Sequence, residues 1–429
     1  MSFKDHLLAR YPSSVVDPLL DSLREKEKHG LYLNFPRFGE ERLLSLFPSL
    51  KPHPIVPHGF YLDEDPYGLG KTLYHNLGAY YLMDPASMLP PFFLCPKPGE
   101  RIADLCAAPG GKTAILSTLL GDDGVLLSND FSHSRALEES RNVERLGLRN
   151  VALTCGDASK LPSVYEGYFD AVLLDAPCSG SAMFRKDPRL EKDWSEEKVL
   201  HCASFQHGLL HAASKLIHPG GRIMYSTCSF SYEEDEGSVL SFLEEHPDFE
   251  ALHLPDNPEF YHHPNLPQGI HLFPHLFPGE GQFLCLLGKK GDASTVPYPP
   301  VQKGAKGIEG LLGRFGLERF DVHKSPQGTY SCLSKPLPIQ GLSLIRYGVE
   351  LGDGNEEKPP HHALAMASKA RGIPLSLEQT KKYLSGETLP LDEKDGFAIV
   401  SHEGLNLGFV KVVRGVAKNH YPKGLRRKY

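Results

Sequence analysis

The sequence predicts an α/β protein whose central domain is built on a doubly wound, mostly parallel sheet. From residue 101 to about residue 288, short apolar runs alternate with longer amphipathic segments, which is typical of repeated β-then-α units. The strand candidates are 101–105, 124–128, 151–154, 171–174 and 221–225. Polar or reactive side chains follow each candidate, and the ligands of such sheets bind outside the carboxyl ends of the strands. We therefore expect a ligand site along one edge of this sheet.

The composition limits the class of protein. At 429 residues, with 40% hydrophobic and 23% charged residues, the chain is long enough for two or three globular domains. No apolar run reaches the roughly 18 residues of a membrane span, and the charged residues 1–10 do not resemble a secretion signal. We expect a cytoplasmic protein that does not contact a membrane. Because the net charge is −7, binding to nucleic acid would require local positive charge.

The cysteines predict free thiols. Eight are present, and no two form a Cys-x-x-Cys pair, so we expect no zinc site and no other metal. In a reducing compartment they stay unpaired, and most should be small buried core residues.

A glycine turn follows the first strand candidate. The strand ends at Asp104, and an apolar, helix-like run begins at Ala114. The turn between them is Cys106-Ala107-Ala108-Pro109-Gly110-Gly111-Lys112-Thr113. Such a tight strand-to-helix turn places the N-terminus of a helix against a ligand. Cys106 replaces the first glycine of a phosphate loop, which disfavours an NTPase, and a glycine turn without a ligand stays an alternative.

Carboxylates stand at the ends of the next strand candidates. Asp130 follows the second strand, where it suits the hydroxyl groups of a ribose, and Asp157 follows the third, where it could accept a hydrogen bond from an exocyclic amine. Each could instead cap a helix. The acidic run 233–236 is expected to be a solvated first helical turn, where acidic residues are favoured.

Two cysteines and one carboxyl group match the needs of cytosine methylation. C5 of cytosine becomes nucleophilic only after a thiolate adds to C6, and the reaction also needs a carboxyl group at N3 and a base for the C5 proton. Cys228, Asp175 and Cys178 fit these needs if the strand order is 3-2-1-4-5, since both cysteine loops then flank the glycine turn. Lys112 or a helix N-terminus could stabilise the thiolate. The residues alone leave open which cysteine attacks.

The chain resembles the S-adenosylmethionine-dependent RNA 5-methylcytosine methyltransferases over about residues 78–290. The resemblance rests on 104–113, on Asp130 with Arg135 and Arg145-Leu146-Gly147, on 156–158, on 175–180 and on 225–229. It implies a Rossmann-like class I methyltransferase domain at 96–290.

The resemblance also implies residue roles. Cys228 would be the attacking thiol, Cys178 would help to release the product, and Asp175, beside Lys112, would touch the target base. The residues that would hold S-adenosylmethionine are Cys106, Ala107, Ala108, Pro109, Gly110, Gly111, Lys112, Asp130, Arg135, Asp157 and Asp175.

The flanking regions resemble the bacterial RsmF-type branch, which modifies 16S ribosomal RNA. The resemblance lies in 408–411 and 418–426, and it implies a PUA-like RNA-binding region at 307–429 after a linker at 291–306. We expect an N-terminal α/β RNA-binding domain at 1–95. Within the C-terminal region, we expect strands at 342–345, 397–400 and 407–413 and a helix at 361–370. Beyond Glu403 the chain has no acidic residue, and its basic residues suit phosphate contacts: Lys411, Arg414, Lys418, Lys423, Arg426, Arg427 and Lys428.

The family pattern is not matched everywhere. Tyr32 stands where the family often has arginine, Asp235 stands where asparagine is common, and 83–88 lacks the usual Gln-Glu pair. We expect a monomer that acts on 16S ribosomal RNA or the small ribosomal subunit. The alternatives are the same chemistry on transfer RNA, and a non-catalytic RNA-binding scaffold.

Overall fold

The computed structural model describes residues 2–293, 296–355 and 357–427. Five parallel strands form the centre of the main sheet: β5 (Arg101–Asp104), β6 (Val125–Asp130), β7 (Val151–Cys155), β8 (Phe169–Asp175) and β9 (Ile217–Thr227). Their order is β7-β6-β5-β8-β9, which is 3-2-1-4-5 in chain order. This order confirms the predicted doubly wound sheet, with its switch point between β5 and β8.

Antiparallel strands extend this sheet on both sides. Beyond β9 lie β13 (Gln282–Lys289), β12 (Leu266–Leu272) and β11 (Tyr261–His263), and β10 (Phe249–Leu252) pairs with β13. Beyond β7 lies β16 (Leu344–Tyr347). The sequence placed this run among the strands of a C-terminal region, whereas in the structure it belongs to the central sheet. The physical reason is that β16 covers the backbone groups of β7, which would otherwise form an open edge.

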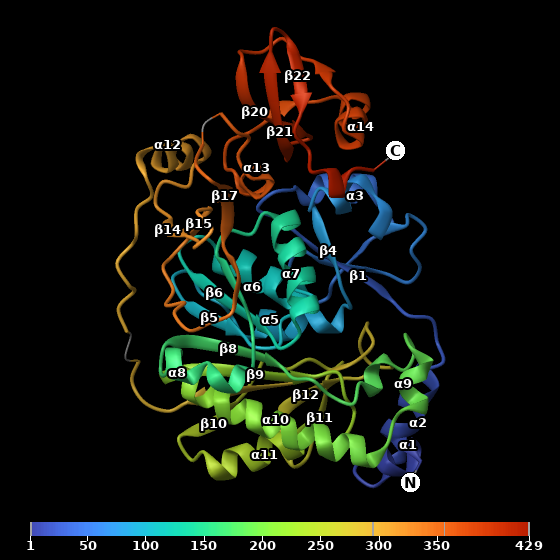
Figure 1. Ribbon diagram of the computed structural model, residues 1–429. Helices are drawn as coiled ribbons and strands as arrows, with labels where there is room; N and C mark the ends of the chain where they lie inside the picture. Colours follow the sequence, from blue (N-terminus) through green and yellow to red (C-terminus); the bar gives the residue numbers. More distant parts are fainter. Residues whose placement is uncertain (1, 294–295, 356, 428–429) are drawn as a thin grey trace.

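Helices cover both faces of the sheet (Figure 1). One face carries α5 (Leu89–Phe93), α6 (Gly111–Leu120) and α7 (His133–Leu146), whose apolar side chains share one core cluster with Ile102 and Leu126. The other carries α8 (Pro162–Tyr165), α10 (Glu196–Leu216) and α11 (Glu236–Glu245), which pack on Ala103 and Val172. Because both faces are covered, the central strands are almost continuously apolar.

The N-terminal region contributes a small sheet with short helices around it and, before the sheet, the two helices α1 and α2. Its elements are α1 (Phe3–Leu8), α2 (Ser13–Ser22), β1 (His29–Leu33), α3 (Glu40–Leu46), β2 (Lys51–Pro52), β3 (Gly59–Leu62), η1 (Leu69–Lys71), α4 (Leu73–Asn76), β4 (Tyr80–Leu82) and η2 (Ala86–Met88). The strand order is β2-β3-β1-β4. Helices α1 and α2 lie apart from this sheet, because Leu7 and Leu19 pack on Phe230 and Phe273 of the main domain.

The C-terminal region forms two further sheets. Its elements are α12 (Lys306–Phe315), β14 (Asp321–Lys324), β15 (Tyr330–Leu333), β17 (Val349–Gly352), α13 (His362–Ala367), β18 (Ile373–Pro374), α14 (Leu377–Ser385), β19 (Leu389–Pro390), β20 (Gly396–His402), β21 (Leu405–Val413), β22 (Val416–Asn419) and η5 (Lys423–Leu425). The strand orders are β14-β15-β17 and β18-β20-β21-β22-β19. Between the main domain and α12, the described part of 291–306 has no helix or strand before Lys306.

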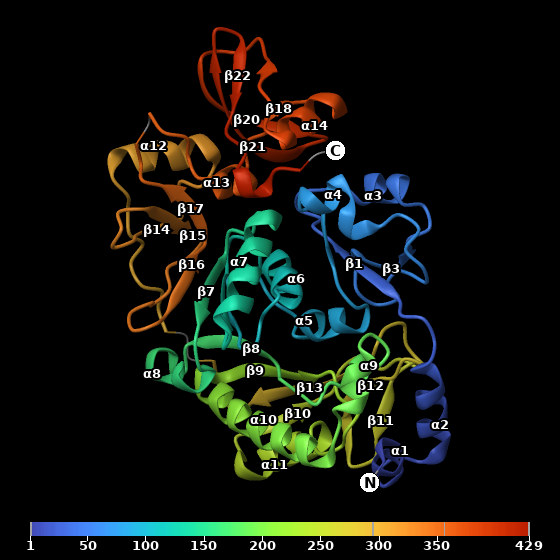
Figure 2. The same ribbon diagram turned by 45° about the vertical axis from the view of Figure 1, so that its right-hand side comes forward.

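The second C-terminal sheet packs on the N-terminal sheet. Leu31 and Phe60 lie in one core cluster with Tyr383 and Val410, so the N-terminal sheet and the second C-terminal sheet meet above α7 (Figure 2). Residues 294–295 of the linker and Lys428 of the basic tail lie outside the described residues. No described helix is both long and apolar enough to cross a membrane.

Candidate active site

Two thiols meet where neighbouring strands end. Cys178 lies in the loop after β8, and Cys228 directly follows β9. Because β8 and β9 are parallel neighbours, their ends reach the same edge of the sheet. The two Sγ atoms lie 3.0 Å apart, and both cysteines are free and partly exposed.

The pKa of Cys178 is raised by its neighbour. The hydrogen bond with Cys228, followed by burial and the charge of Cys228, raises the pKa of Cys178 well above its ordinary value. Cys178 therefore stays protonated at neutral pH.

Asp175 is fixed by three hydrogen-bond donors. Its Oδ2 accepts from Lys112 Nζ at 2.6 Å, and its Oδ1 accepts from Ser226 Oγ at 2.7 Å and from Gln282 Nε2 at 2.9 Å. Burial alone would lower the pKa of Lys112, but the Asp175 carboxylate and the charge of Cys228 outweigh it and raise that pKa. Lys112 is thus a permanent cation near the two sulfurs.

The acidic run after Cys228 is buried, so its prediction as a solvated helical turn is wrong. Glu234 and Asp235 are fully buried, and α11 begins only at Glu236. Glu234 binds both cysteine loops: Oε1 accepts from the Ser179 amide at 2.7 Å, and Oε2 accepts from the hydroxyls of Ser179 and Ser229 at 2.5 and 2.6 Å. The carboxylate can be buried because these donors satisfy it.

The other acids of the run have partners too. Asp235 accepts a hydrogen bond from Thr227, the residue before Cys228, and Glu236 pairs with His271 at 2.7 Å. Glu233 keeps some exposure and pairs with His6 and Arg10 of the N-terminal region. The run therefore connects the loop of Cys228 to the protein interior.

The glycine turn has the geometry that the sequence predicts. Gly110 adopts φ +99°, and α6 begins at the next residue. A side chain at Gly110 would meet Cγ of Glu139 at 3.0 Å, so glycine is required by both conformation and space. Under the turn, Asp104 Oδ1 is buried and has no hydrogen-bond partner among the described residues. A buried polar atom without a partner, next to a helix N-terminus, fits a bound ligand.

Of the remaining predicted residues, Asp130 and Arg135 bind this turn, whereas Asp157 binds the segment after β7. Asp130 accepts from the amides of Ala108 at 3.2 Å and Ser132 at 2.8 Å, and Arg135 donates to the carbonyl of Ala108. Asp157 caps η3 (Ala158–Lys160) by accepting from the Ser159 amide at 2.9 Å, which lowers the pKa of Asp157. For Asp157 the structure thus displays the helix cap that the sequence left as an alternative.

Comparisons with known proteins agree with this geometry. Residues 91–288 match the family model described as 16S rRNA methyltransferase RsmB/F, and residues 370–427 match that of the methyltransferase RsmF PUA domain. The ribosomal RNA small subunit methyltransferase F of Shewanella loihica is 32% identical, over 88% of this chain and 84% of that protein. The enzyme of the same name from Salmonella typhi is 32% identical, over 99% of this chain and 96% of that protein. The chain belongs to the family of the ribosomal RNA small subunit methyltransferases F.

A solved structure supports the same assignment. A methyltransferase homologue from Pyrococcus horikoshii superposes with a TM-score of 0.58 at 27% identity, covering 67% of this chain and 94% of that one. The predictions of a Rossmann-like methyltransferase fold with a PUA-like C-terminal part, and of an RNA 5-methylcytosine methyltransferase, are confirmed.

Sequence reasoning missed several side chains of this RsmB/F-type site. Ser179, Ser226 and Ser229 lie inside the quoted motifs, so their positions carried a signal. Gln282 carried none, because it lies on the antiparallel strand β13, more than a hundred residues after Asp175. Phe131 carried an unused signal: it follows Asp130 directly, and its side chain is 77% exposed beside the turn residues.

Proposed function

We propose that the protein transfers a methyl group from S-adenosylmethionine to C5 of a cytosine in 16S ribosomal RNA, through a covalent bond between Cys228 and C6. The observation that carries this proposal is the pair of sulfurs 3.0 Å apart, with the Lys112–Asp175 ion pair at the end of the same strands. The RNA is assigned from the names of the family and of its relatives, and from the PUA match.

The proposed reaction begins at Cys228. Its thiolate forms a bond to C6, and the electrons of the C5–C6 double bond move toward C5 and N3. N3 takes up a proton from water, and Asp175 accepts a hydrogen bond from the resulting N3–H, while Lys112, Ser226 and Gln282 keep the carboxylate in place. S-adenosylmethionine, when bound, would supply an electrophilic methyl group to the activated C5, with S-adenosylhomocysteine as the leaving group.

Cys178 completes the reaction as the base. Once Cys228 is bound to C6 it is a neutral thioether, so the hydrogen bond and the charge that raise the pKa of Cys178 are lost. Two of the causes that raise the pKa of Cys178 are then removed, and Cys178 can lose its own proton to water. Its thiolate takes the C5 proton, the double bond re-forms, the C6–S bond breaks, N3 returns its proton to water, and Cys228 leaves as a thiolate.

The donor would be held at the glycine turn. The residues proposed to bind it are those of 106–112, with Asp130 for the ribose hydroxyls and Arg135, Asp157 and Asp175 around it. Their support is the helix N-terminus after Gly110 and the buried, unpartnered Asp104 Oδ1.

The Cys178→Ala variant tests the order of the two thiols. Without its base, the methylated adduct cannot eliminate, so we expect a covalent protein–RNA complex that survives denaturing electrophoresis and maps to Cys228. The matched control is Cys228→Ala, which should form no complex. A complex on any other residue, or one formed by Cys228→Ala, would contradict the proposed roles.

A further inference from the structure

A groove lies where four parts of the chain meet. A cavity of about 430 Å³ is lined by α4 of the N-terminal region, by α7, by the β16–β17 and α13 segments, and by the C-terminal residues 421–427. The lining also includes Gly424 of the C-terminal tail.

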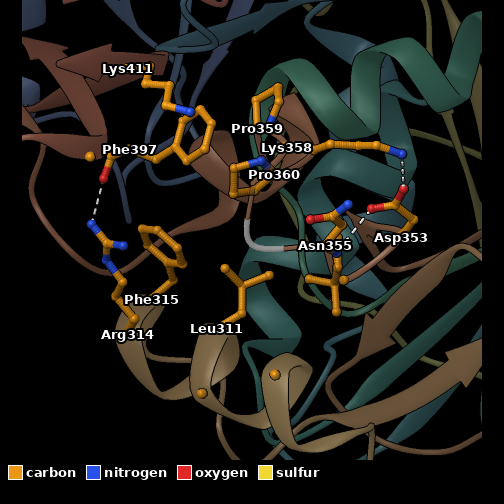
Figure 3. Close-up of a pocket in the computed structure, with 15 residues that line it drawn as sticks. Leu311, Arg314, Phe315, Asp353, Asn355, Lys358, Pro359, Pro360, Phe397 and Lys411 are labelled. Carbon is orange, nitrogen blue, oxygen red and sulfur yellow. Dashed lines mark hydrogen bonds and ion pairs between the residues drawn. The ribbon is translucent and has the colours of Figure 1, made fainter. Parts of the chain in front are cut away.

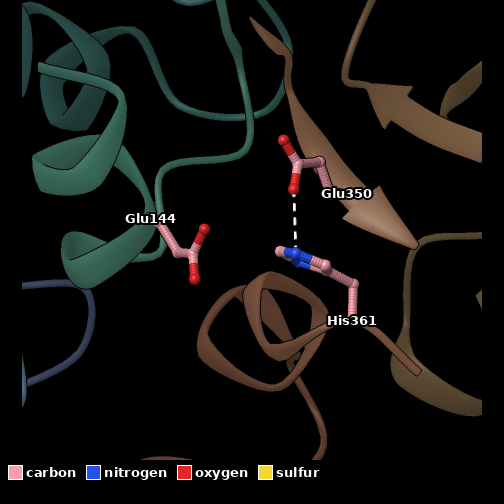
Figure 4. Close-up of side chains that lie close together, drawn as sticks. All are labelled: Glu144, Glu350 and His361. Carbon is pink, nitrogen blue, oxygen red and sulfur yellow. Dashed lines mark ion pairs between the residues drawn. The ribbon is translucent and has the colours of Figure 1, made fainter. Parts of the chain in front are cut away.

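The carboxylates of this groove are already neutralised. Glu144 binds Arg346 at 2.8 Å and His362 at 3.0 Å, and Glu350 binds His361 at 3.0 Å, with Arg346 at 3.6 Å. Figure 4 shows Glu350 and His361 facing each other beside Glu144. Glu144, Glu350 and His361 lie close enough to hold a metal ion, but the guanidinium of Arg346 already supplies the positive charge between the two acids.

Other arginines of the groove have no acidic partner within residues 2–293, 296–355 and 357–427. Arg141 and Arg427 are exposed, and their side chains make no hydrogen bond or ion pair with any residue that the structure describes. Among the same residues, Arg145 and Arg426 donate to uncharged oxygens, such as the carbonyls of His75 and Tyr421. The groove therefore has an excess of positive charge in a protein whose net charge is −7.

This groove reaches the back of the glycine turn. Asn142, which lines it, donates a hydrogen bond to the carbonyl of Pro109 at 3.0 Å. Along α7, Arg141 lies eight residues after His133, which is about 12 Å at the rise of an α-helix. A short stretch of RNA could thus lie in the groove while a neighbouring base occupies the active site.

A second cavity, lined by residues of α12, β17 and β20, differs in this respect. Figure 3 shows its basic side chains directed at partners within the protein. Arg314 donates to the carbonyl of Phe397 at 2.6 Å, Lys411 lies 5.0 Å from the centre of the Phe397 ring, and Lys358 pairs with Asp353 at 2.7 Å. Its cations are engaged, whereas Arg141 and Arg427 are not.

We propose that the groove lined by Arg141, Arg145, Arg426 and Arg427 binds the phosphodiester backbone of the RNA substrate next to the target base. Guanidinium groups suit phosphates because they donate two parallel hydrogen bonds. The proposal rests on the proposed function in one respect, that the substrate is RNA.

The test is the salt dependence of RNA binding. The affinity of the full-length protein for a labelled single-stranded RNA of mixed sequence is measured at increasing KCl for the wild type, for Arg141→Gln with Arg427→Gln, and for Arg319→Gln. Arg319 is an exposed arginine outside the groove and serves as the matched control. Each phosphate contact to single-stranded nucleic acid contributes about 0.7 to the slope of log K against log salt, so the double variant should lose about 1.4. Its KM for RNA should rise, while kcat and the affinity for S-adenosylmethionine stay unchanged.

Each outcome decides the matter. A slope in the double variant equal to that of the wild type and of Arg319→Gln would overturn the groove proposal, whether or not the enzyme methylates RNA. The single variant Arg427→Gln, near the end of the chain, should give about half of the shift without affecting folding. If the wild type bound RNA with the expected slopes but methylated no cytosine, the proposed function would fail and the groove would stand.

Discussion

The positions of the two thiols depend on the single buried carboxylate of Glu234. It accepts hydrogen bonds from Ser179, next to Cys178, and from Ser229, next to Cys228, while Gln206 of α10 donates to it at 3.1 Å. Neither cysteine touches Glu234 through a hydrogen bond that the structure records. Glu234 is therefore a positioning residue, which holds the two cysteine loops at a fixed separation.

The Glu234→Gln variant tests this role. In this variant an amide nitrogen, which is itself a donor, replaces a carboxylate oxygen that accepts hydrogen bonds. It would face the donors of the cysteine loops, so these loops should separate. Hydrogen bonds to a charged group are worth about 1.5–3 kcal/mol, which corresponds to a loss of roughly 10- to 100-fold in the single-turnover rate. The affinity for S-adenosylmethionine should stay unchanged. Glu233→Gln, in the adjacent and partly exposed position, is the control, and equal rate losses in both variants would contradict the role of Glu234.

Phe131 offers a second test at the level of single residues. An aromatic side chain that is 77% exposed beside Asp130 suits stacking on a flat base of the donor. Such contacts are worth about 0.5–1.5 kcal/mol, so Phe131→Ala should weaken the binding of S-adenosylmethionine by up to about tenfold in calorimetry. Phe205→Ala, at a residue of α10 that is 51% exposed, should leave that affinity unchanged. Equal affinities for the Phe131→Ala variant and the wild type would exclude the contact.

At the scale of single residues, the sequence predicts the residues inside motifs better than the residues that hold those motifs in place. Cys178, Cys228, Asp175 and Lys112 were named from the chemistry that they permit and from the resemblance, and the structure brings them together. Glu234 was missed because four consecutive acidic residues before a helix usually face solvent. Its donors come from three separate segments, so only the tertiary structure reveals why it can be buried.

Helix α7 connects the donor turn to the RNA groove. Its buried residues Ala136, Glu139, Ser140, Val143 and Leu146 follow the spacing of one helical face, and Gly147 ends the helix with φ +66°. Glu139 lies under the glycine turn and accepts hydrogen bonds from Thr113 at 2.9 Å and from Ser128. Burial raises the pKa of Glu139 from its ordinary value to about 7.

This pKa predicts that stability is lost as the pH rises from 4.5 to neutrality. The unfolded chain releases the Glu139 proton near pH 4.5, whereas the folded protein keeps it until about pH 7. The contribution of Glu139 to the free energy of unfolding is thus complete below pH 4.5, and it is lost as the pH rises through 7. Relative to Glu139→Gln, which does not titrate, the wild type should lose up to about 3 kcal/mol of unfolding free energy between pH 4.5 and 8. Urea denaturation at several pH values measures this.

Glu138→Gln is the matched control for this prediction. Glu138 is the exposed neighbour of Glu139 on the same helix, so its replacement should leave the pH dependence of the wild type unchanged. A difference between the wild type and Glu139→Gln that stays constant from pH 4.5 to 8 would contradict the assigned pKa.

Elements were predictable where their pattern is local. The five parallel strands followed from apolar runs separated by helical segments, whereas their order entered the sequence analysis only as a condition, which the structure meets. Strand β16 had a correct apolar signal, but its partner β7 lies nearly two hundred residues earlier. Local patterning carries no information on such a pairing. The apolar spacing in α1 and α2 likewise predicts helices without indicating that they pack on the main domain.

In the whole molecule, the N-terminal and C-terminal sheets share one core above α7. Arg42 of α3 also pairs with Glu403 of the turn between β20 and β21 at 2.7 Å. This packing places the acid-free C-terminal tail beside the methyltransferase domain, where Arg426 and Arg427 line the groove. The sequence predicted the basic tail, but not which of its residues face the main domain. Their placement depends on the contact between the N-terminal sheet and the second C-terminal sheet.

The central claim, a methyl transfer to C5 of a ribosomal cytosine through Cys228, is tested most directly by bisulfite sequencing of cellular RNA. A strain that lacks the protein is compared with the same strain carrying the wild-type chain or Cys228→Ala. We predict that one or a few cytosine marks in 16S ribosomal RNA disappear, that the wild type restores them, and that Cys228→Ala does not. Marks that persist in the deletion strain, that return with Cys228→Ala, or that disappear only from transfer RNA would contradict this account.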